Sequence, residues 1–351
     1  MINDINRHGG DIYGNQVKLD YSINVNPLPV PDEIKNVIKE AADELIHYPD
    51  PKCRALHAML EEYTGIDRRY CLLGNGASEL IMNIFARIRP KRLLLFSPTF
   101  NEYERCARVH GADIYKLDYR ADEEAVVAAI KEHDIDMIVF CRPNNPTGTL
   151  FDLGQLMNLL DYCHKRQIRV LLDECFYSLC DEADTDRAYA SVIDANKLRA
   201  YPQLVVLRAF TKCFGMPGIR LGVAYCADLD LISRIKDLLP TWNISSLAQL
   251  TACQFLRHPE YVKDYRALIK RGRDTLSAFL ESKGAKVVPS SAGFIMFSTS
   301  KDLYTPLLSR GILIRDCSDM VDSKEYTYRI AVRDTEDNME LIGALEEIFN
   351  G

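Results

Sequence analysis

The chain has 351 residues, 47% of them hydrophobic and 26% charged, and this length predicts about two domains with a large buried core. With 18 glycines and 15 prolines, the composition excludes collagen-like, low-complexity and disordered chains. Acidic residues outnumber basic ones by 50 to 43, the net charge is −7 and no long run of Lys or Arg occurs, so we expect no nucleic-acid partner.

We predict that residues 1–30 form an extended N-terminal arm. They include His8-Gly9-Gly10 and Asn26-Pro27-Leu28-Pro29, which contain too many helix breakers for a helix. Residues 1–7 lack the apolar stretch of a secretory signal, and apolar runs elsewhere fall far below the ~20 residues that span a bilayer. The 11 cysteines are scattered, without a C-x-x-C pair or zinc-ligand spacing. We therefore expect a cytoplasmic protein with reduced thiols, no metal and no membrane contact.

Residues 31–241 are predicted to form an α/β domain. Apolar runs occur at 93–96, 137–140, 170–172, 204–207 and 221–225. They are nearly continuous in valine, isoleucine and leucine, as in strands of a parallel or mixed sheet that is covered on both faces. Amphipathic segments lie between them, for example at 125–130 and 153–165. This alternation predicts an α/β layer fold, in which ligands bind beyond the carboxyl ends of the strands.

A second, smaller domain is predicted for residues 242–351, because the pattern changes after Pro240. Residues 245–283 are typical of one long helical stretch. Shorter strand-like pieces follow at 293–298, 312–315 and 326–332, and a last helix begins at Asn338. This order of elements indicates an α+β unit.

The segment Gly76-Ala77-Ser78 precedes a predicted helix. Small residues there let backbone N–H groups and the Ser78 hydroxyl approach an anion at a helix N-terminus, which predicts a phosphate site. The alternative is that Ser78 simply caps the helix. The segment is not G-x-G-x-x-G, and no G-x-x-x-x-G-K-S/T occurs, so nicotinamide-dinucleotide and P-loop sites are disfavoured.

Polar residues also follow the later strands of this domain. Asn145 lies in a turn with two prolines and a glycine that can fix its amide, although the turn could be purely structural. Asp173 ends a buried strand, where an unpaired carboxylate is costly and a cationic ligand group would be a suitable partner. Lys212 and Arg220 flank a loop rich in glycine and proline. A lysine in an apolar setting can act as a nucleophile toward carbonyls, and the alternative is an exposed lysine beside a loop.

In this order, the motifs resemble the cofactor site of fold-type I pyridoxal 5′-phosphate (PLP) enzymes of the class I/II aminotransferase superfamily. The resemblance covers nearly the whole chain and implies a three-layer α/β/α large domain with a mainly parallel sheet, plus a smaller C-terminal domain. It implies that Lys212 binds the cofactor covalently and shuttles protons, that Asp173 pairs with the pyridinium nitrogen, and that Asn145 hydrogen-bonds the 3′-oxygen of the ring. The implied phosphate-binding residues are Gly76, Ala77, Ser78, Thr211 and Arg220.

Two tyrosines complete the resemblance. Tyr103 matches the aromatic residue that stacks on the cofactor ring. Tyr48 matches a tyrosine that reaches the phosphate of the partner subunit's cofactor. The resemblance therefore implies a homodimer.

Two branches of the superfamily fit, the histidinol-phosphate aminotransferases and the L-threonine-O-3-phosphate decarboxylases of cobalamin biosynthesis. His8-Gly9-Gly10 and the segments 21–28, 47–50 and 311–317 resemble the decarboxylases. The aminotransferases commonly have a tyrosine three residues after the aspartate, whereas this chain has Phe176, as the decarboxylases do. The alternative is that Tyr177 turns inward to replace that tyrosine.

Arg329 matches the family arginine that grips the substrate α-carboxylate. A phosphate on the substrate would be a second handle that sets which Cα bond stands perpendicular to the ring. The candidates to bind it are His8, Asn26, Arg315 and Arg333, each of which could instead be structural; His8 is favoured because glycines follow it in the arm.

We therefore expect decarboxylation of a phosphorylated hydroxy amino acid, first of all L-threonine O-3-phosphate to aminopropanol phosphate. The alternative is an aminotransferase that acts on histidinol phosphate, or a related amino acid, with 2-oxoglutarate. A PLP-fold protein kept for binding or regulation is a third hypothesis. The complete set of site residues and the lack of an appended DNA-binding module argue against it.

Overall fold

The computed structural model describes residues 8–180, 191–321 and 324–351, so residues 1–7 of the predicted arm lie outside it. Within these ranges the large sheet has seven strands in the order β2-β8-β7-β6-β5-β3-β4. Their bounds, in that order, are Cys71–Gly74, Gly222–Cys226, Leu204–Ala209, Arg169–Asp173, Met137–Cys141, Arg92–Ser97 and Asp113–Asp118. The strands from β7 to β4 pair in parallel, and β8 runs antiparallel to both its neighbours. The predicted, mainly parallel sheet is confirmed.

The two edge strands were not predicted from the sequence. Strand β4 carries charged residues along its length and is half-exposed, which hides its strand pattern and is a common way to protect a sheet edge. Strand β2 is a buried run of four residues, short enough to be overlooked. It leads directly into Gly76, so its position decides where the first site motif lies.

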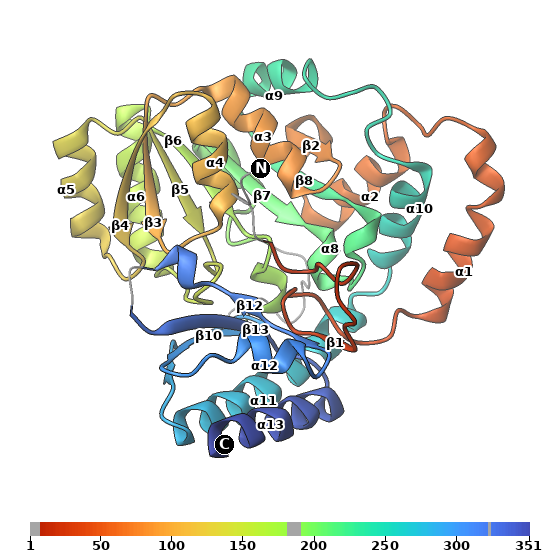
Figure 1. Ribbon diagram of the computed structural model, residues 1–351. Coiled ribbons are helices and arrows are strands. Elements are labelled where there is room, and N and C mark those ends of the chain that lie inside the picture. The colour runs from red at the N-terminus through yellow and green to blue at the C-terminus, as the bar shows by residue number, and fades with distance from the viewer. Residues whose placement is uncertain (1–7, 181–190, 322–323) are drawn as a thin grey trace.

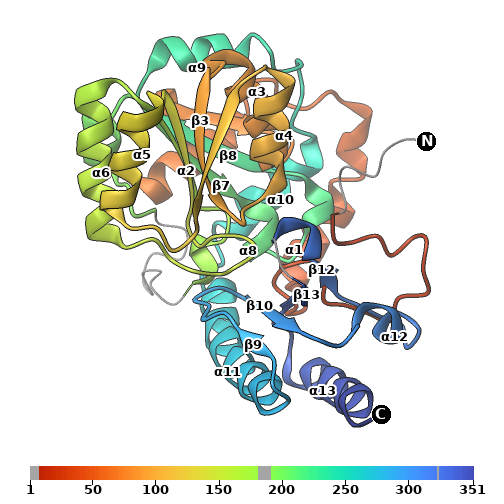
Figure 2. The same ribbon diagram turned by 60° about the vertical axis from the view of Figure 1, so that its left-hand side comes forward.

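Helices cover both faces of this sheet, as Figures 1 and 2 show. The helices α3, α4 and α9 pack on one face and α2, α5, α6, α7 and α10 on the other. The bounds of the first group are Ala77–Ile88, Asn101–Val109 and Leu229–Lys236, and those of the second are Arg54–Thr64, Glu123–His133, Leu153–Arg166, Ala195–Ala200 and Ser246–Phe255. Side chains alternate along β6, with Leu171 on the first face and Leu172 on the second. The three-layer α/β/α arrangement is thereby confirmed.

A smaller antiparallel sheet lies below the large one in Figure 1, in the order β12-β13-β10-β9. Its strands are Arg315–Asp316, Tyr326–Ala331, Phe294–Thr299 and Lys286–Val287. Helices α11 (Glu260–Ser282) and α13 (Thr335–Asn350) pack on it through leucines such as Leu276 and Leu341. The smaller α+β unit is thus present, while its boundary near residue 242 stays a prediction.

Two predicted elements of this region are wrong in detail. The stretch 245–283 is two helices, α10 and α11, separated around His258 and Pro259. Proline lacks the N–H that a continuous helix needs and restricts the residue before it, so a new helix begins there. The run 312–315 is likewise divided between β11 (Ile312–Leu313), which pairs with β1 (Leu19–Asp20), and β12, which pairs with β13.

The described part of the arm, coloured red in Figure 1, contains β1 as its only strand, and Figure 2 shows a loop of it extending to one side of the two sheets. Tyr21 accepts a hydrogen bond from the Ala331 N–H, which holds the arm on the small sheet. None of the described helices is both long and apolar enough to cross a membrane. The remaining helices are α1 (Asp32–Glu40), α8 (Phe210–Cys213), α12 (Tyr304–Leu308) and short 3₁₀ turns at Asp43–Ile46, Arg68–Tyr70, Tyr177–Leu179, Pro217–Ile219 and Ser318–Met320.

Candidate active site

A cavity of about 110 Å³ lies beyond the carboxyl ends of β5, β6 and β7, beside the first turn of α3. Parallel strands place the residues that follow them at one edge of the sheet, which is why residues far apart in the sequence meet here. The predicted residues that line it are Ala77, Ser78, Tyr103, Asn145, Asp173, Thr211, Lys212 and Arg220. The structure therefore brings together the core of the predicted site.

The first turn of α3 and the Arg220 side chain form a cradle for an anion. Gly76 precedes the helix with φ +79°, and a Cβ atom there would stand 2.5 Å from the Arg220 guanidinium. Ser78 is the second residue of the helix, and no side chain caps the helix N-terminus, so the alternative of a Ser78 cap is wrong. The N–H groups of a first helical turn lack partners within the helix, and the Arg220 guanidinium lies close to Gly76 beside them, an arrangement that suits a phosphate group.

Asp173 is fully buried and held by neutral donors. Its Oδ2 accepts a hydrogen bond from the Tyr103 hydroxyl at 2.5 Å, and its Oδ1 accepts one from the Cys175 N–H at 2.8 Å. Burial raises the pKa of Asp173, while the hydrogen bonds from Cys175 and Tyr103 oppose that rise. Tyr103 packs edge-on against Phe100. The residue predicted to stack on the cofactor ring therefore also orients Asp173, through its hydroxyl.

Lys212 lies in the same cavity, and its amine faces the Phe176 ring. No acceptor in the described ranges bonds its Nζ, which lies 5.7 Å from the centre of the Phe176 ring. Burial, together with the nearby charge of Arg329, lowers the pKa of Lys212 to about 8. The Asn26 N–H donates to the Lys212 carbonyl at 2.9 Å and fixes this turn of the chain. A lysine with such a pKa supplies a neutral, nucleophilic amine near neutral pH.

Arg329 reaches from the small sheet to Asn145, which lines the cavity, although Arg329 itself lines neither this cavity nor the larger one that Arg315 lines. Its Nη1 donates to Asn145 Oδ1 at 2.5 Å and its Nη2 donates to the Ser22 carbonyl at 2.5 Å. Oriented so that both halves of its amide have partners, Asn24 accepts from Nε and Nη1 of the same guanidinium at 3.2 Å each. Burial lowers the pKa of Arg329 to about 10, and the charge of Arg315 acts in the same direction. Because its amide oxygen is occupied, Asn145 has its NH₂ group left as a donor.

Arg315 stands directly opposite Arg329 in the pairing of β12 with β13. Both side chains are buried, and directly opposed like charges destabilise a sheet. The carboxylate of Asp319 lies 3.9 Å from Arg315, a distance too long for a hydrogen bond. A second cavity, of about 440 Å³, is lined by Arg315, His8 and Ser22. This pair of arginines therefore favours a ligand with two negative groups.

Three of the predicted residues lie elsewhere. Asn26 donates to the Cys213 carbonyl at 3.0 Å and accepts from the Leu28 N–H, so its amide holds the backbone around Lys212. Arg333 donates to Asp337 at 2.7 Å on α13. Tyr48 is 78% exposed and stacks on Trp242, with ring centres 4.3 Å apart. Neither Asn26 nor Arg333 lines the two cavities, and the predicted role of Tyr48 would require a second copy of the chain.

Sequence reasoning missed Glu102, Cys175 and Ser22, which contact site residues directly. For Cys175 a signal existed, because side chains two residues apart in extended chain lie on the same side and Asp173 was already in the site. For Glu102 and Ser22 no local signal existed, because their partners His8 and Arg329 are far away in the sequence.

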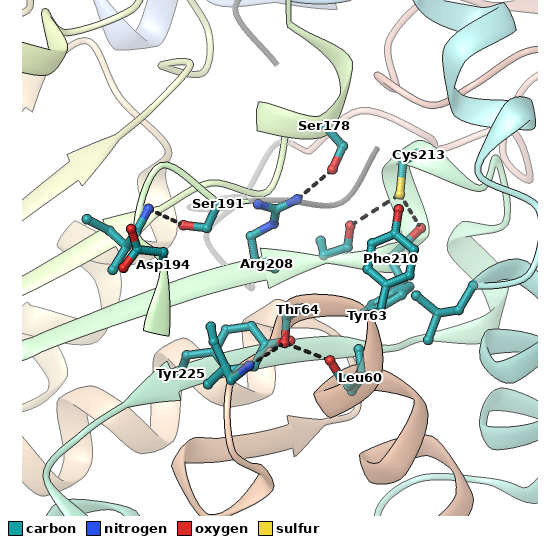
Figure 3. A pocket seen from close by; sticks show the side chains of 14 residues that line it. Leu60, Tyr63, Thr64, Ser178, Ser191, Asp194, Arg208, Phe210, Cys213 and Tyr225 are labelled. Atoms are coloured by element: carbon teal, nitrogen blue, oxygen red, sulfur yellow. Dashed lines mark hydrogen bonds between the residues drawn. The ribbon is translucent and has the colours of Figure 1, made fainter. Parts of the chain in front are cut away.

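On the opposite face of the sheet lies a separate cavity of about 50 Å³, shown in Figure 3. Arg208 crosses it and donates to Ser178 at 2.6 Å and to Glu174 at 3.2 Å. Tyr177 lies under the guanidinium of Arg208, 5.9 Å from the ring centre, and does not line the Asp173 cavity. The alternative that Tyr177 turns into the site is therefore wrong, and Phe176 is the residue that lines it.

Comparison with known proteins matches residues 16–345 to the family model described as aminotransferase class I and II. A provisionally named threonine-phosphate decarboxylase of Caldanaerobacter subterraneus subsp. tengcongensis is 34% identical over 97% of this chain and 94% of that protein. The threonine-phosphate decarboxylase of Salmonella typhimurium is 29% identical over 95% of this chain and 92% of that protein. The crystal structure of the histidinol-phosphate aminotransferase from Clostridium acetobutylicum is 29% identical, with a TM-score of 0.84 over 95% of this chain and 99% of that one.

Proposed function

The chain belongs to the class I and II aminotransferase family, whose cofactor is PLP, and we propose that it decarboxylates a phosphorylated hydroxy amino acid. The proposed substrate is L-threonine O-3-phosphate and the product aminopropanol phosphate. The observation that carries this proposal is the pair of buried arginines on adjacent strands of the small sheet: Arg315 lines the larger cavity, and Arg329 contacts Asn145, which lines the smaller one.

The cavity has the groups that PLP requires. Lys212 offers an amine with no competing acceptor among the described residues, and Asp173 lies in the same cavity as an acid for the pyridine nitrogen. The absence of a side chain on Gly76 lets the Arg220 guanidinium lie against the first turn of α3, where the guanidinium and the N–H groups of that turn would bind the phosphate. When bound, PLP supplies an electron sink for the electron pair left on the substrate Cα.

Each side chain then has a defined task. Lys212 would attach the cofactor and would serve as the group that delivers a proton to the substrate Cα. Asp173, oriented by the Tyr103 hydroxyl and the Cys175 N–H, would pair with the pyridine nitrogen of the cofactor. Arg329 donates to Asn145 Oδ1 and so orients the amide, whose NH₂ group would donate to the 3′-oxygen of the cofactor.

Threonine phosphate matches the charge of the cavity wall. Its carboxylate suits Arg329, and its phosphate suits Arg315 and His8, which line the larger cavity. An unphosphorylated amino acid would leave Arg315 buried without a close negative partner, which is costly. This wall therefore favours a substrate with both a carboxylate and a phosphate.

The bond that breaks is set by the direction in which the carboxylate is held, because the bond perpendicular to the cofactor ring is the one that is weakened. Arg329 is fixed by Asn145, Ser22 and Asn24, so it holds a carboxylate in one direction. Phe176 packs against Phe294 and places no hydroxyl beside the 3′-oxygen. This departure from the aminotransferase pattern supports decarboxylation.

Transamination of histidinol phosphate is the second candidate, and the similarity to the Clostridium acetobutylicum aminotransferase favours it. Histidinol phosphate has no carboxylate, so Arg329 would serve 2-oxoglutarate in the second half of that reaction. Arg315 would bind the phosphate in either case. The two candidates thus differ in what Arg329 holds while the first bond breaks.

We further propose a homodimer. Tyr48 and Trp242 form an exposed stacked pair, and Leu45 and Ile46 beside them are also exposed. Such a patch favours burial against a second copy, in which Tyr48 would reach the cofactor phosphate of the partner subunit. Sedimentation of the PLP-loaded protein at micromolar concentration tests this, with Ile46→Lys as the variant expected to dissociate it.

The test of the reaction compares substrates. PLP-loaded protein is incubated with threonine phosphate, with serine phosphate, and with histidinol phosphate plus 2-oxoglutarate, while CO₂ and glutamate are measured. We expect CO₂ from threonine phosphate and no glutamate. Glutamate without CO₂ would establish the aminotransferase, and a faster reaction with serine phosphate would change the assigned substrate.

A further inference from the structure

Glu102 is a buried carboxylate with no part in the chemistry described above. It lies in the first turn of α4, next to Tyr103, and its side chain is 8% exposed. It accepts hydrogen bonds from His8 Nε2 at 3.2 Å, from Arg105 Nε at 2.9 Å and from Arg105 Nη2 at 2.5 Å. The hydrogen bond from His8, followed by those from Arg105, lowers the pKa of Glu102 to about 2, so it is a permanent anion.

His8 reaches Glu102 from the arm and stands between the two cavities. Its ring centre lies 5.9 Å from that of Phe100, which lines the cavity that contains Lys212 and Asp173. His8 itself lines the larger cavity together with Arg315. The imidazole is thus at the border between the place of the cofactor and the place proposed for the substrate phosphate.

Two residues after His8, at Gly10, the arm is anchored to Ser22. The Gly10 N–H donates to Ser22 Oγ at 2.7 Å, and a Cβ atom on Gly9 would stand 2.2 Å from the Ser22 carbonyl, so only glycine fits there. The anchor fixes the backbone after His8 but leaves its side chain free to turn. Among the described residues, Glu102 is the hydrogen-bond partner that fixes the imidazole.

We propose that Glu102 is a positioning residue that holds the His8 imidazole toward the substrate phosphate and thereby sets selectivity for phosphorylated over unphosphorylated amino acids. Nε2 is occupied by Glu102, which leaves the Nδ1 side of the ring for the ligand. Holding the side chain in advance removes part of the ordering cost of binding, worth about 3- to 10-fold in affinity. This inference rests on the proposed function for the identity of the substrate.

The main experiment uses Glu102→Gln in the PLP-loaded enzyme. We expect KM for threonine phosphate to rise about 3- to 10-fold, kcat to change less than about twofold and the rate measured with unphosphorylated threonine to stay the same as in the wild type. His8→Asn should give the same rise, and the double variant no further rise. Glu104→Gln, on the same helix and paired with Arg108 and Lys116, is the matched control that should leave both substrates unchanged.

A purely structural Glu102 gives different results. An equal loss with both substrates, a lower PLP content, or additive effects of the two substitutions would each overturn the inference. Because Tyr103 follows Glu102 directly, PLP content by absorbance separates an effect on the cofactor from an effect on the arm.

A binding experiment separates this inference from the proposed function. Inorganic phosphate is titrated calorimetrically into the PLP-loaded wild type and both variants, which requires no turnover. We expect the wild type to bind phosphate, and we expect Glu102→Gln and His8→Asn to weaken that binding by the same factor. Equal phosphate binding by all three, or none by the wild type, would overturn the role of Glu102 even if threonine phosphate is decarboxylated. A weakened titration in an enzyme that releases no CO₂ would support Glu102 while the proposed reaction fails.

Discussion

Asp173 and Glu174 are neighbours in the sequence, but they face opposite sides of the large sheet and are stabilised in different ways. Glu174 is paired with Arg208 at 3.2 Å and accepts from the Val192 N–H at 3.2 Å, so its charge is balanced within the chain. Asp173 is held by Tyr103 and Cys175, which carry no charge. At the end of β6, a buried carboxylate is thus stabilised by a cation on one side of the sheet and by neutral donors on the other.

The cations nearby show the same contrast. Arg208 spans the cavity of Figure 3 and is bonded to Glu174 and Ser178. Lys212, four residues later, has no bonded acceptor among the described residues, and its pKa is lowered to about 8. On one face the opposite charges meet and stabilise the fold. On the other they are kept apart, and a ligand that bridges them gains both interactions.

Replacing Lys212 tests the contrast most severely. Lys212→Met should lower turnover by at least about 10³-fold, because attachment of the cofactor and proton delivery are both lost. It should also stabilise the PLP-free protein at pH 7 by on the order of 3 kcal/mol, because a buried cation whose pKa lies well below 10.5 is removed. Steady-state assays and urea denaturation measure the two effects. The control is Lys197→Met, because Lys197 lies 3.8 Å from Asp194, which lines the Figure 3 cavity. If the two substitutions changed turnover and stability equally, the contrast between Lys212 and the paired cations would be wrong.

Breaking the ion pair of Arg208 with Glu174 should lower the stability of the fold and leave turnover unchanged. Arg208→Met leaves Glu174 buried without its cation and should destabilise the fold by about 3–5 kcal/mol. Adding Glu174→Gln should recover most of that loss. Denaturation of the two variants measures it, and turnover per folded molecule should stay within about twofold of wild type. A double variant no more stable than Arg208→Met would show that the pair is not the source of the effect.

Neutralising the two adjacent carboxylates should separate their roles. Asp173→Asn keeps the shape of the side chain but loses the charge, and kcat should fall by about 10²- to 10³-fold, in line with the loss of one electrostatic contact in a site. Glu174→Gln should leave kcat within about twofold. Assays at saturating PLP provide the comparison. A similar fall in both would contradict the assignment of Asp173 to the cofactor side.

The smallest effect expected is one of pH. Burial lowers the pKa of Lys212 from 10.5 to about 8, so the neutral amine increases as the pH rises and becomes the main form above pH 8. The rate of PLP uptake by the PLP-free protein should increase about tenfold per unit below pH 8 and level off above it. Absorbance stopped-flow measures this rate. A rate that climbs steadily to pH 10 would show an unperturbed lysine.

The sequence allowed prediction of those site residues whose position depends on local order. Asn145, Asp173 and Lys212 follow strands of one parallel sheet, so their meeting follows from topology. Asn26 and Arg333 were predicted to bind substrate, yet they hold the Lys212 turn and α13, because their partners are set by packing between distant segments. The end of the first helix in 245–283 could have been recognised at Pro259, whereas the contact of His8 with Glu102 depends on the course of the arm.

The contact of Ser22 with Arg329 has a consequence for how the protein is made. These residues are 307 positions apart, and Asn145 is 184 positions from the same arginine. A ribosome delivers the arm before the large sheet and Arg329 after it, and the last strand of that sheet, β8, ends at Cys226, so the sheet can form on the nascent chain before the substrate wall exists. The wall proposed to recognise the substrate therefore forms only after Arg329 has been synthesised, later than the strands that position Asp173 and Lys212.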